Sequence, residues 1–225
     1  MLPIHNYLSM ELPKYFHAFF MQEKEKPYFS KLMGAYNALK QKHELFPPEA
    51  LTFNAFNYFD LDELKVVILG QDPYYTVGYA NGLAFAVNLN QPTPKSLQNI
   101  FKEVANEYGD VKTDKTLIAW AKQGVLLLNT SLCVINNQPN SCKDLGWTEF
   151  VKDFIEYCNQ NTKHLVYLLW GNNAISFKQY IDEKNNFVLT SAHPSPLSCK
   201  GFFHNQHFKL CNQYLQTFWH TCITW

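Results

Sequence analysis

The sequence predicts an α/β fold, a single domain built as a three-layer α/β/α sandwich around a four-stranded parallel sheet. Four short apolar runs are typical of buried strands, and segments with helical periodicity separate them along the chain. Strands that alternate with helices are joined by right-handed crossovers, so they pair in parallel and are covered on both faces. The length suits one domain, residues 1–225, with a sizeable core, although two small domains would also fit.

Residues 1–50 are expected to form a helical part of the same domain. Apolar residues recur at helical spacing over residues 15–20 and again over residues 28–39. Pro27 stands where a second helix could begin, because proline is favoured in the first helical turn. The pair Pro47-Pro48 then ends the helical region.

Strands and helices alternate over the rest of the chain. Strands are predicted at residues 65–70, 124–129, 164–171 and 186–192, and helices after Ser96 and at residues 116–123, 146–157 and 205–219. The loop from Pro92 through Pro94 to Ser96 is expected to be rigid, with Ser96 as the N-cap of the following helix. Because parallel strands end at one edge of the sheet, the polar residues that follow them converge there. These residues are Gln71, Asp72, Asn129, Gly171, Asn172 and His193.

Composition argues against several classes of protein. The formal net charge is zero, which does not suit a protein that binds nucleic acid with its whole surface. Residues 185–225, however, contain no Asp or Glu, so this segment could bind a polyanion. The six cysteines form no CxxC pair, so neither a metal site nor a disulfide framework is indicated. No stretch suits a membrane span, and Met1 to Met10 lack a signal-peptide pattern. We therefore expect a soluble, cytoplasmic protein without metal or cofactor.

The convergent side chains suit one kind of chemistry. Taken alone, Asp72 is more often a helix cap or turn residue, but Pro73 favours an extended conformation for it. An amide such as that of Asn129 offers a donor and an acceptor side by side, which suits the edge of a nucleobase. A single carboxylate can act as a base or face a developing cation, and an imidazole can donate a proton. Together they suit cleavage beside a heterocycle, with a cationic sugar and an anionic leaving base.

Five motifs occur in collinear order between Lys65 and Phe203. They are Gly70-Gln71-Asp72-Pro73-Tyr74, Gly82-Leu83-Ala84-Phe85, Gly124-Val125-Leu126-Leu127-Leu128-Asn129-Thr130, Leu169-Trp170-Gly171 and His193-Pro194-Ser195-Pro196-Leu197-Ser198. Together these motifs closely resemble uracil-DNA glycosylase of the family-1 type. The resemblance implies a metal-independent enzyme that flips uracil out of single- or double-stranded DNA and hydrolyses the N-glycosidic bond. It would release free uracil, leave an abasic site and so initiate base excision repair.

The resemblance also implies a role for each matching residue. Asp72 would orient or activate the water and face the sugar cation, and a neutral His193 would donate to uracil O2 as charge builds on the base. Within the uracil pocket, Asn129 would recognise the O4 and N3 edge, Phe85 would stack on the ring, Tyr74 would exclude a 5-methyl group and Gln71 would line the wall. Leu197 would fill the gap left by the flipped nucleotide. The DNA backbone would be held by Pro92, Pro94, Ser96, Gly171, Asn172, Ser195 and Ser198.

The sequence departs from the family pattern at three places. Tyr75 stands where histidine is usual, the loop at Cys199-Lys200 is one residue shorter with lysine near the usual arginine, and Asn172 replaces a serine. We expect activity with a changed rate or pH profile. The resemblance further implies inhibition by the DNA-mimicking proteins that target this family, and a monomer is the simpler expectation. The alternatives are a non-catalytic DNA-binding scaffold, an Asp-dependent metal hydrolase, and a sister glycosylase for mismatched or modified bases.

Overall fold

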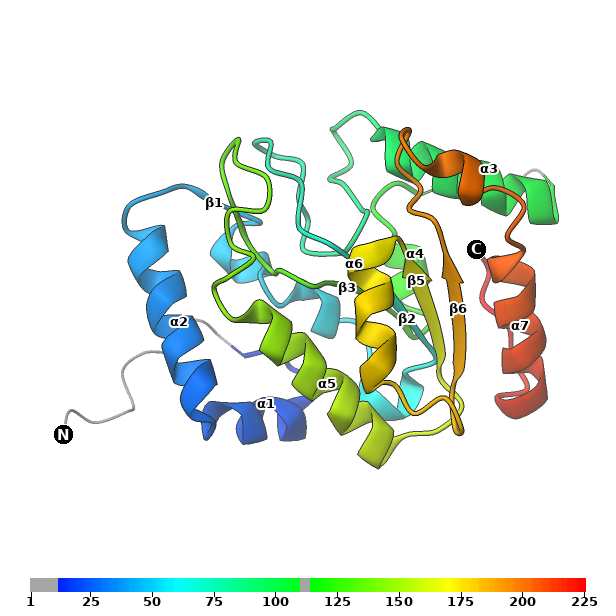
Figure 1. Ribbon diagram of the computed structural model, residues 1–225, viewed down its shortest axis with the longest axis horizontal. Helices are drawn as coiled ribbons and strands as arrows, with labels where there is room; N and C mark the ends of the chain where they lie inside the picture. Colours follow the sequence, from blue (N-terminus) through cyan, green and yellow to red (C-terminus); the bar gives the residue numbers. More distant parts are fainter. Residues whose placement is uncertain (1–11, 110–113) are drawn as a thin grey trace.

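A four-stranded parallel sheet forms the centre of the molecule, as predicted. The computed structural model describes residues 12–109 and 114–225, so residues 1–11 of the predicted N-terminal helical part lie outside it. The strands are β2 (Val66–Gly70), β3 (Val125–Asn129), β5 (Val166–Trp170) and β6 (Phe187–Ser191). Their order across the sheet is β3-β2-β5-β6, and every neighbouring pair is parallel (Figure 1).

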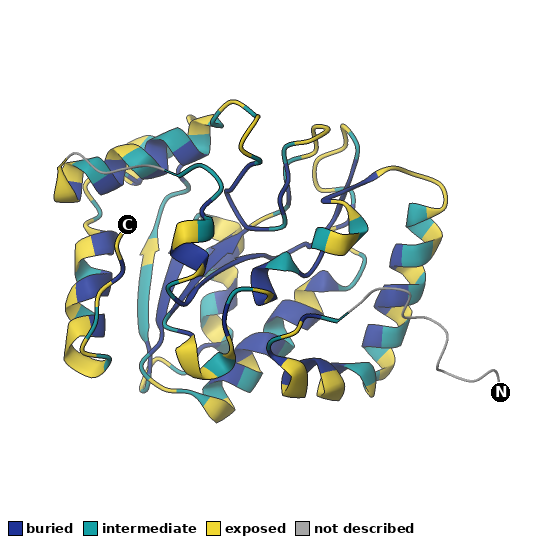
Figure 2. Cartoon of the chain, turned by 180° about the vertical axis from the view of Figure 1, so that it is seen from behind, coloured by how far each residue is buried: buried dark blue, intermediate teal, exposed yellow. Residues whose placement is uncertain are grey.

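Helices cover both faces of the sheet because three of its four strands are fully buried. Every residue of β2, β3 and β5 is buried, whereas the edge strand β6 is only half-buried (Figure 2). A parallel strand buried on both faces reads as a continuous apolar run, which is why these segments could be predicted. The predicted α/β fold class is confirmed. Among the described residues, no helix is long and apolar enough to span a membrane.

The helices occupy the segments between the strands. Their bounds are α1 (His17–Lys24), α2 (Pro27–Lys40), α3 (Lys95–Tyr108), α4 (Ile118–Ala121), α5 (Trp147–Asn161), α6 (Asn172–Ile175) and α7 (His207–Phe218). Short 3-10 turns lie at Glu49–Leu51, Asn54–Phe56, Leu61–Glu63, Ser176–Tyr180 and Cys199–Gly201. Helix α5 contacts α1 and α2, while α4 packs on β3 and both α6 and α7 pack on β5. Pro27 is the first residue of α2, as its position predicted.

Two local features differ from the prediction. Ser96 is not an N-cap: α3 begins at Lys95 with Pro94 as the capping residue, so Ser96 lies inside the first turn. Proline fixes an extended approach to the helix, which lets the helix begin two residues earlier than a serine cap would. A small antiparallel sheet of β1 (Leu45–Phe46) and β4 (Val134–Ile135) was not predicted. Strands of two residues are too short to carry a periodic pattern, so they could not be predicted.

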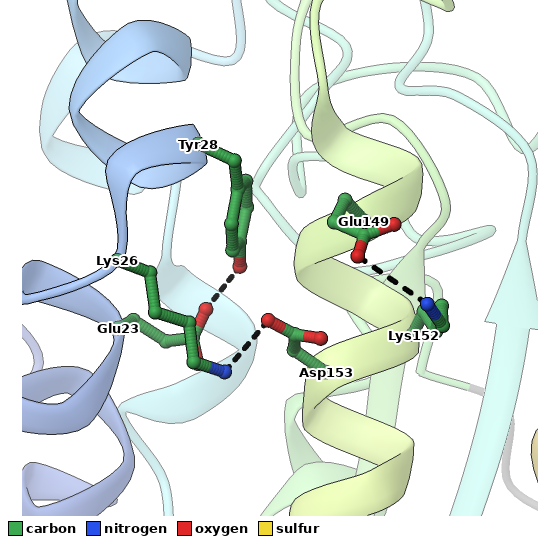
Figure 3. Close-up of polar contacts among 6 residues, drawn as sticks. All are labelled: Glu23, Lys26, Tyr28, Glu149, Lys152 and Asp153. Atoms are coloured by element: carbon green, nitrogen blue, oxygen red, sulfur yellow. Dashed lines mark hydrogen bonds and ion pairs between the residues drawn. The ribbon is translucent and has the colours of Figure 1, made fainter.

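A buried carboxylate anchors the turn between α1 and α2 on α5. Glu23 is 1% exposed, and its carboxylate is 2.7 Å from the Lys26 ammonium, which also contacts Asp153 of α5 at 2.7 Å (Figure 3). The Tyr28 hydroxyl donates a further hydrogen bond to Glu23. Burial raises the pKa of Glu23, because desolvation disfavours its charged form, while Lys26 and Tyr28 lower it in part. Lys26 therefore provides a cation that two carboxylates share at this junction.

Replacing Lys26 by Met is expected to lower the free energy of unfolding by about 2 kcal/mol, because Glu23 would stay buried without its cation. We expect less than for a fully buried pair, since the Lys26 side chain is 41% exposed. Urea denaturation followed by circular dichroism would measure the change. The control is Lys152→Met, which removes the partner of the exposed Glu149 at the same spacing on α5 and should leave stability nearly unchanged. Equal losses in the two variants would contradict this account.

Candidate active site

A cavity of about 190 Å³ opens at the carboxyl edge of the sheet. Open α/β sheets bind ligands at this edge, where the strand order reverses. The cavity is lined by Gly70, Gln71, Asp72, Pro73, Tyr74, Tyr75, Ala80, Gly82, Leu83, Phe85, Ala86, Ser96, Asn129 and His193. The structure thus brings together Asp72, His193 and the four residues expected to hold a base, although they come from three strand ends and a loop.

Asn129 is positioned by the pairing of β2 with β3. Gly70 lies opposite Asn129 in the parallel register, and a Cβ added at Gly70 would lie 2.3 Å from the Asn129 carbonyl oxygen. Only glycine leaves room for this amide. The Asn129 side chain is 5% exposed, and its Oδ1 atom has no hydrogen-bond partner within the described part of the chain. Since a buried polar atom without a partner costs free energy, this oxygen is a prepared acceptor for a ligand N–H.

Asp72 follows β2 and is half-buried at the cavity wall. Its Oδ2 atom accepts a hydrogen bond of 2.9 Å from the backbone N–H of Asn140, which comes from a distant loop. Burial raises the pKa of Asp72 because desolvation disfavours the carboxylate, and the Asn140 N–H opposes this by stabilising the charged form. The carboxylate is therefore more basic than an exposed aspartate while one of its oxygens is held in place.

His193 follows β6 and is held as a neutral ring. Its Nδ1 atom accepts a hydrogen bond of 3.0 Å from the backbone N–H of Ser195, so the proton of the neutral imidazole is on Nε2. Burial lowers the pKa of His193, which also favours the neutral form. Gly171 permits this placement, because a Cβ there would lie 2.8 Å from that of His193. His193 can thus donate a hydrogen bond from Nε2 without carrying a charge.

Phe85 has a strained backbone that holds its ring beside His193. Its φ of 65° lies in the left-handed region, which is unfavourable for a bulky side chain. The Phe85 ring centroid lies 5.7 Å from that of His193 and 5.6 Å from that of Trp170. The Tyr74 hydroxyl donates a hydrogen bond of 3.2 Å to the Phe85 carbonyl, and burial raises the pKa of Tyr74 and keeps it neutral. Two aromatic side chains therefore form a fixed part of the wall.

The residues expected to contact DNA outside the uracil pocket lie mostly outside the cavity. Ser96 is one of its lining residues, but Pro92, Pro94, Gly171, Asn172, Ser195, Leu197 and Ser198 are not. In the loop after β6, the Ser198 hydroxyl donates to the His193 carbonyl at 2.7 Å and lies 3.0 Å from the hydroxyl of Ser195. Leu197 is fully exposed at the tip of this loop. The loop is thus ordered by its own hydrogen bonds and projects an apolar side chain into solvent.

Sequence reasoning missed two residues that hold these loops. Asn140 binds Asp72, as described above, and the buried Asn99 of α3 donates a hydrogen bond of 2.8 Å to the Pro194 carbonyl beside His193. Both are asparagines far from the motifs in sequence, and no periodicity marks them. Among the described residues, no group of three or more His, Cys, Asp or Glu side chains could hold a metal ion.

The fold and this cavity define the class of the protein: an α/β protein whose sheet edge places one carboxylate, one imidazole and two aromatic side chains around a single cavity. Residues 56–216 match the model of the uracil DNA glycosylase superfamily. The chain is 43% identical over 208 residues to uracil-DNA glycosylase of Ureaplasma parvum, covering 92% of this chain and 98% of that protein. It is 46% identical over 198 residues to the Francisella tularensis protein of the same name, covering 86% and 90% of the two chains.

A solved structure agrees with these sequence relatives. The crystal structure of mimivirus uracil-DNA glycosylase superposes with a TM-score of 0.85 at 30% identity, covering 92% of this chain and 84% of that one. The chain belongs to the uracil DNA glycosylase superfamily. The resemblance inferred from its motifs is confirmed, and the chain is a hydrolase with uracil-DNA glycosylase activity in base excision repair.

Replacing Gly70 by Ala is expected to displace Asn129 and lower kcat/KM for uracil release at least tenfold, with a loss of stability of about 1–3 kcal/mol from overpacking. The added methyl group would also lie 2.8 Å from the Ala84 side chain, so it has no free direction. Thermal melting and a uracil-release assay would measure both effects. The control is Gly34→Ala in α2, where an added Cβ meets nothing within 4 Å and should stabilise the helix. Wild-type activity in Gly70→Ala would show that the close approach is not needed.

Proposed function

We propose that the cavity takes up a uracil flipped out of DNA and that Asp72 and His193 cleave its N-glycosidic bond. The observation that carries this proposal is the buried side-chain oxygen of Asn129, Oδ1, which has no hydrogen-bond partner among the described residues. Uracil N3–H supplies the donor that this oxygen lacks, and the amide nitrogen beside it can donate to uracil O4. Cytosine has no N3–H and carries an amino group in place of O4, so the same amide disfavours it.

The proposed chemistry uses the two groups in opposite charge states. The C1′–N1 bond breaks and its electron pair leaves with uracil, whose O2 then receives a hydrogen bond from the neutral His193 Nε2–H. The Asp72 carboxylate faces the sugar cation and orients a water molecule, whose oxygen bonds to C1′ as its proton passes to Asp72. Burial supports both roles, since it makes the carboxylate more basic and keeps the imidazole uncharged.

The aromatic wall supports the proposed selection by size. Phe85 would stack on the uracil ring, and Tyr74, fixed by its hydrogen bond to the Phe85 carbonyl, would occupy the space of a 5-methyl group. Thymine would then be excluded by bulk, while Gln71 lines the same cavity. The rigid placement matters because a mobile ring would yield to the extra methyl group.

Neutral donors support the proposed grip on single- and double-stranded DNA. The hydroxyls of Ser96, Ser195 and Ser198, the loop of Pro92 and Pro94, and Gly171 with the exposed Asn172 would contact phosphates. The exposed Leu197 would fill the gap left in the base stack. This assignment explains how a chain of zero net charge could hold a polyanion.

The departures from the family pattern are compatible with this function. Tyr75 is 42% exposed and lines the cavity, so it can contact a bound nucleotide in place of a histidine. The shortened loop forms a 3-10 turn at Cys199–Gly201 and leaves Leu197 projecting, while Lys200 is exposed nearby. We expect a changed rate or pH profile rather than loss of activity.

We extend the proposal to the assembly and location of the protein. One continuous buried core runs from Phe16 to Trp225, which supports a single domain, and we propose that it acts as a monomer in the bacterial cytoplasm. A variant of the mimivirus enzyme has been solved in complex with UGI; it superposes at a TM-score of 0.89 with 30% identity, covering 95% of this chain and 88% of that one. We propose that an acidic, DNA-mimicking inhibitor of this kind also binds here, against the acid-free segment 185–225.

His193 is expected to titrate below its ordinary pKa and to carry its proton on Nε2 at pH 7. NMR of the imidazole nitrogens distinguishes the two tautomers and follows the titration. The buried His207, whose Nδ1 accepts a hydrogen bond from Trp170, should titrate with a pKa of about 4. In the unfolded chain these two histidines would bind protons at their ordinary pKa, whereas in the folded protein they stay neutral to a lower pH. Their contribution to stability is therefore present above about pH 6.5 and is lost as the pH falls. A protonated His193 at pH 7 would overturn its proposed role.

Wild-type protein is expected to release free uracil from single- and double-stranded oligonucleotides in the presence of EDTA. Thymine and cytosine should stay in place, and Asp72→Asn and His193→Leu should each lower kcat at least a hundredfold, as losses of basic and electrostatic catalysis do. Chromatography of the released bases makes the measurement. Folded protein that binds DNA without releasing uracil would favour the non-catalytic scaffold, and activity lost in EDTA would favour a metal hydrolase.

A further inference from the structure

A loop after β4 lies against the loop that carries Asp72. Residues 136–142 follow the short strand Val134–Ile135, and the loop is braced by its own contacts. The Ile135 N–H donates to the Ser141 hydroxyl at 2.8 Å, and Asn136 is tied to Glu44 through a side-chain hydrogen bond of 2.7 Å. Cys142, at the end of the loop, has a buried side chain. The loop is therefore a fixed wall rather than a free tip.

This wall makes three hydrogen bonds with the Asp72 loop. The Asn137 N–H donates to the Tyr75 carbonyl at 2.9 Å. The Asn140 N–H donates to Asp72 Oδ2 at 2.9 Å, and the Asn140 side-chain carbonyl accepts a hydrogen bond from the Gln71 side-chain amide. A single residue, Asn140, thus holds both the carboxylate and the amide that precedes it in the chain.

The backbone of Asn140 has a conformation that lets its N–H and its side chain serve two partners. Asn140 has a φ of 61°, in the left-handed region that asparagine enters more readily than most residues. Because φ sets the direction of the side chain relative to the N–H of the same residue, an ordinary negative φ would not direct the Asn140 N–H toward Asp72 and its side chain toward Gln71 together. Asparagine at this position thus tolerates the left-handed backbone conformation and also provides the side-chain oxygen that accepts the hydrogen bond from Gln71.

We propose that Asn140 is a positioning residue for the glycosylase reaction, which fixes one oxygen of the Asp72 carboxylate and leaves the other to face the water and the sugar. The inference rests on the proposed role of Asp72. A carboxylate that rotates freely would offer either oxygen at varying distance, whereas one held at Oδ2 keeps a single geometry for the reaction. The Asn140 bond to Gln71 keeps the two loops together when DNA enters.

The same bond influences the protonation of Asp72. The titratable groups near the carboxyl group are Cys142 from the adjoining wall and Tyr74, Tyr75 and His193, which line the same cavity. Burial keeps Tyr74 and His193 uncharged, so they provide no cation to favour ionised Asp72. The backbone N–H groups of Asn140 and of Asp72 itself both oppose burial, so loss of the Asn140 N–H would leave only one of them and the pKa of Asp72 would rise.

Two substitutions separate the backbone role from the side-chain role. Asn140→Gly keeps the left-handed conformation and the N–H but loses the bond to Gln71, and kcat should fall roughly threefold with an unchanged pH profile. Asn140→Ala also disfavours the left-handed conformation. Its kcat should fall roughly tenfold with KM within about twofold. The acidic limb of its pH profile should move up by about half a unit, since the reaction needs ionised Asp72.

The matched control is Asn136→Ala, which removes a side-chain hydrogen bond from the same loop without touching residues 71–75. Its kcat and pH profile should equal those of the wild type. Wild-type kcat and pH profile in Asn140→Ala would overturn the inference, as would a loss of kcat matched by Asn136→Ala. Asp72→Asn, measured alongside, distinguishes failure of the proposed role of Asp72 from failure of the positioning role of Asn140. If Asp72→Asn stays active, the proposed role of Asp72 is wrong. If Asp72→Asn is inactive while the Asn140 variants keep wild-type activity, only the positioning role is wrong.

Discussion

The parallel pairing of β2 with its two neighbours is the constraint on which the site depends. Because β2 lies between β3 and β5, its end is flanked by the ends of both, and the loop after β6 closes over the same edge. The approach of Gly70 to Asn129 is the tightest consequence of this pairing, since no side chain fits between them. Asn129 therefore owes its buried position to the backbone of a different strand. The cavity is shaped by the sheet before any loop contributes.

Burial has opposite chemical consequences for the two central side chains. Desolvation favours the neutral form of any group, so it raises the pKa of Asp72 and lowers that of His193. For His193 the Ser195 N–H on Nδ1 works in the same direction, because it requires an unprotonated nitrogen. For Asp72 the Asn140 N–H works against burial and favours the carboxylate. Within one cavity, the Asn140 N–H thus favours the charged form of Asp72, and the Ser195 N–H favours the neutral form of His193.

The loops around the cavity are held by contacts from outside the motifs. Asn140 holds the loop after β2, and Asn99 of α3 holds the loop after β6 through the Pro194 carbonyl. Leu197 projects into solvent at the tip of its loop. A rigid rim whose loop tip presents an exposed leucine suits an enzyme that must insert a group into a base stack while its reacting groups stay still. The strained backbone of Phe85 belongs to the same rim, where strain persists because the surrounding contacts fix it.

The sequence by itself determined the sheet, the order of the main helices and the family, because buried parallel strands are continuous apolar runs and because five motifs occur in collinear order. It also indicated which polar residues follow the strands, and the structure places Asp72, Asn129 and His193 in one cavity. Only the tertiary structure decided that α3 begins at Lys95 rather than after Ser96, and that β1 pairs with β4. Only the tertiary structure placed Asn140 on Asp72, across 68 residues of chain. The physical reason is that periodicity records which face of an element is buried, whereas a single hydrogen bond between distant loops leaves no repeating pattern in the sequence.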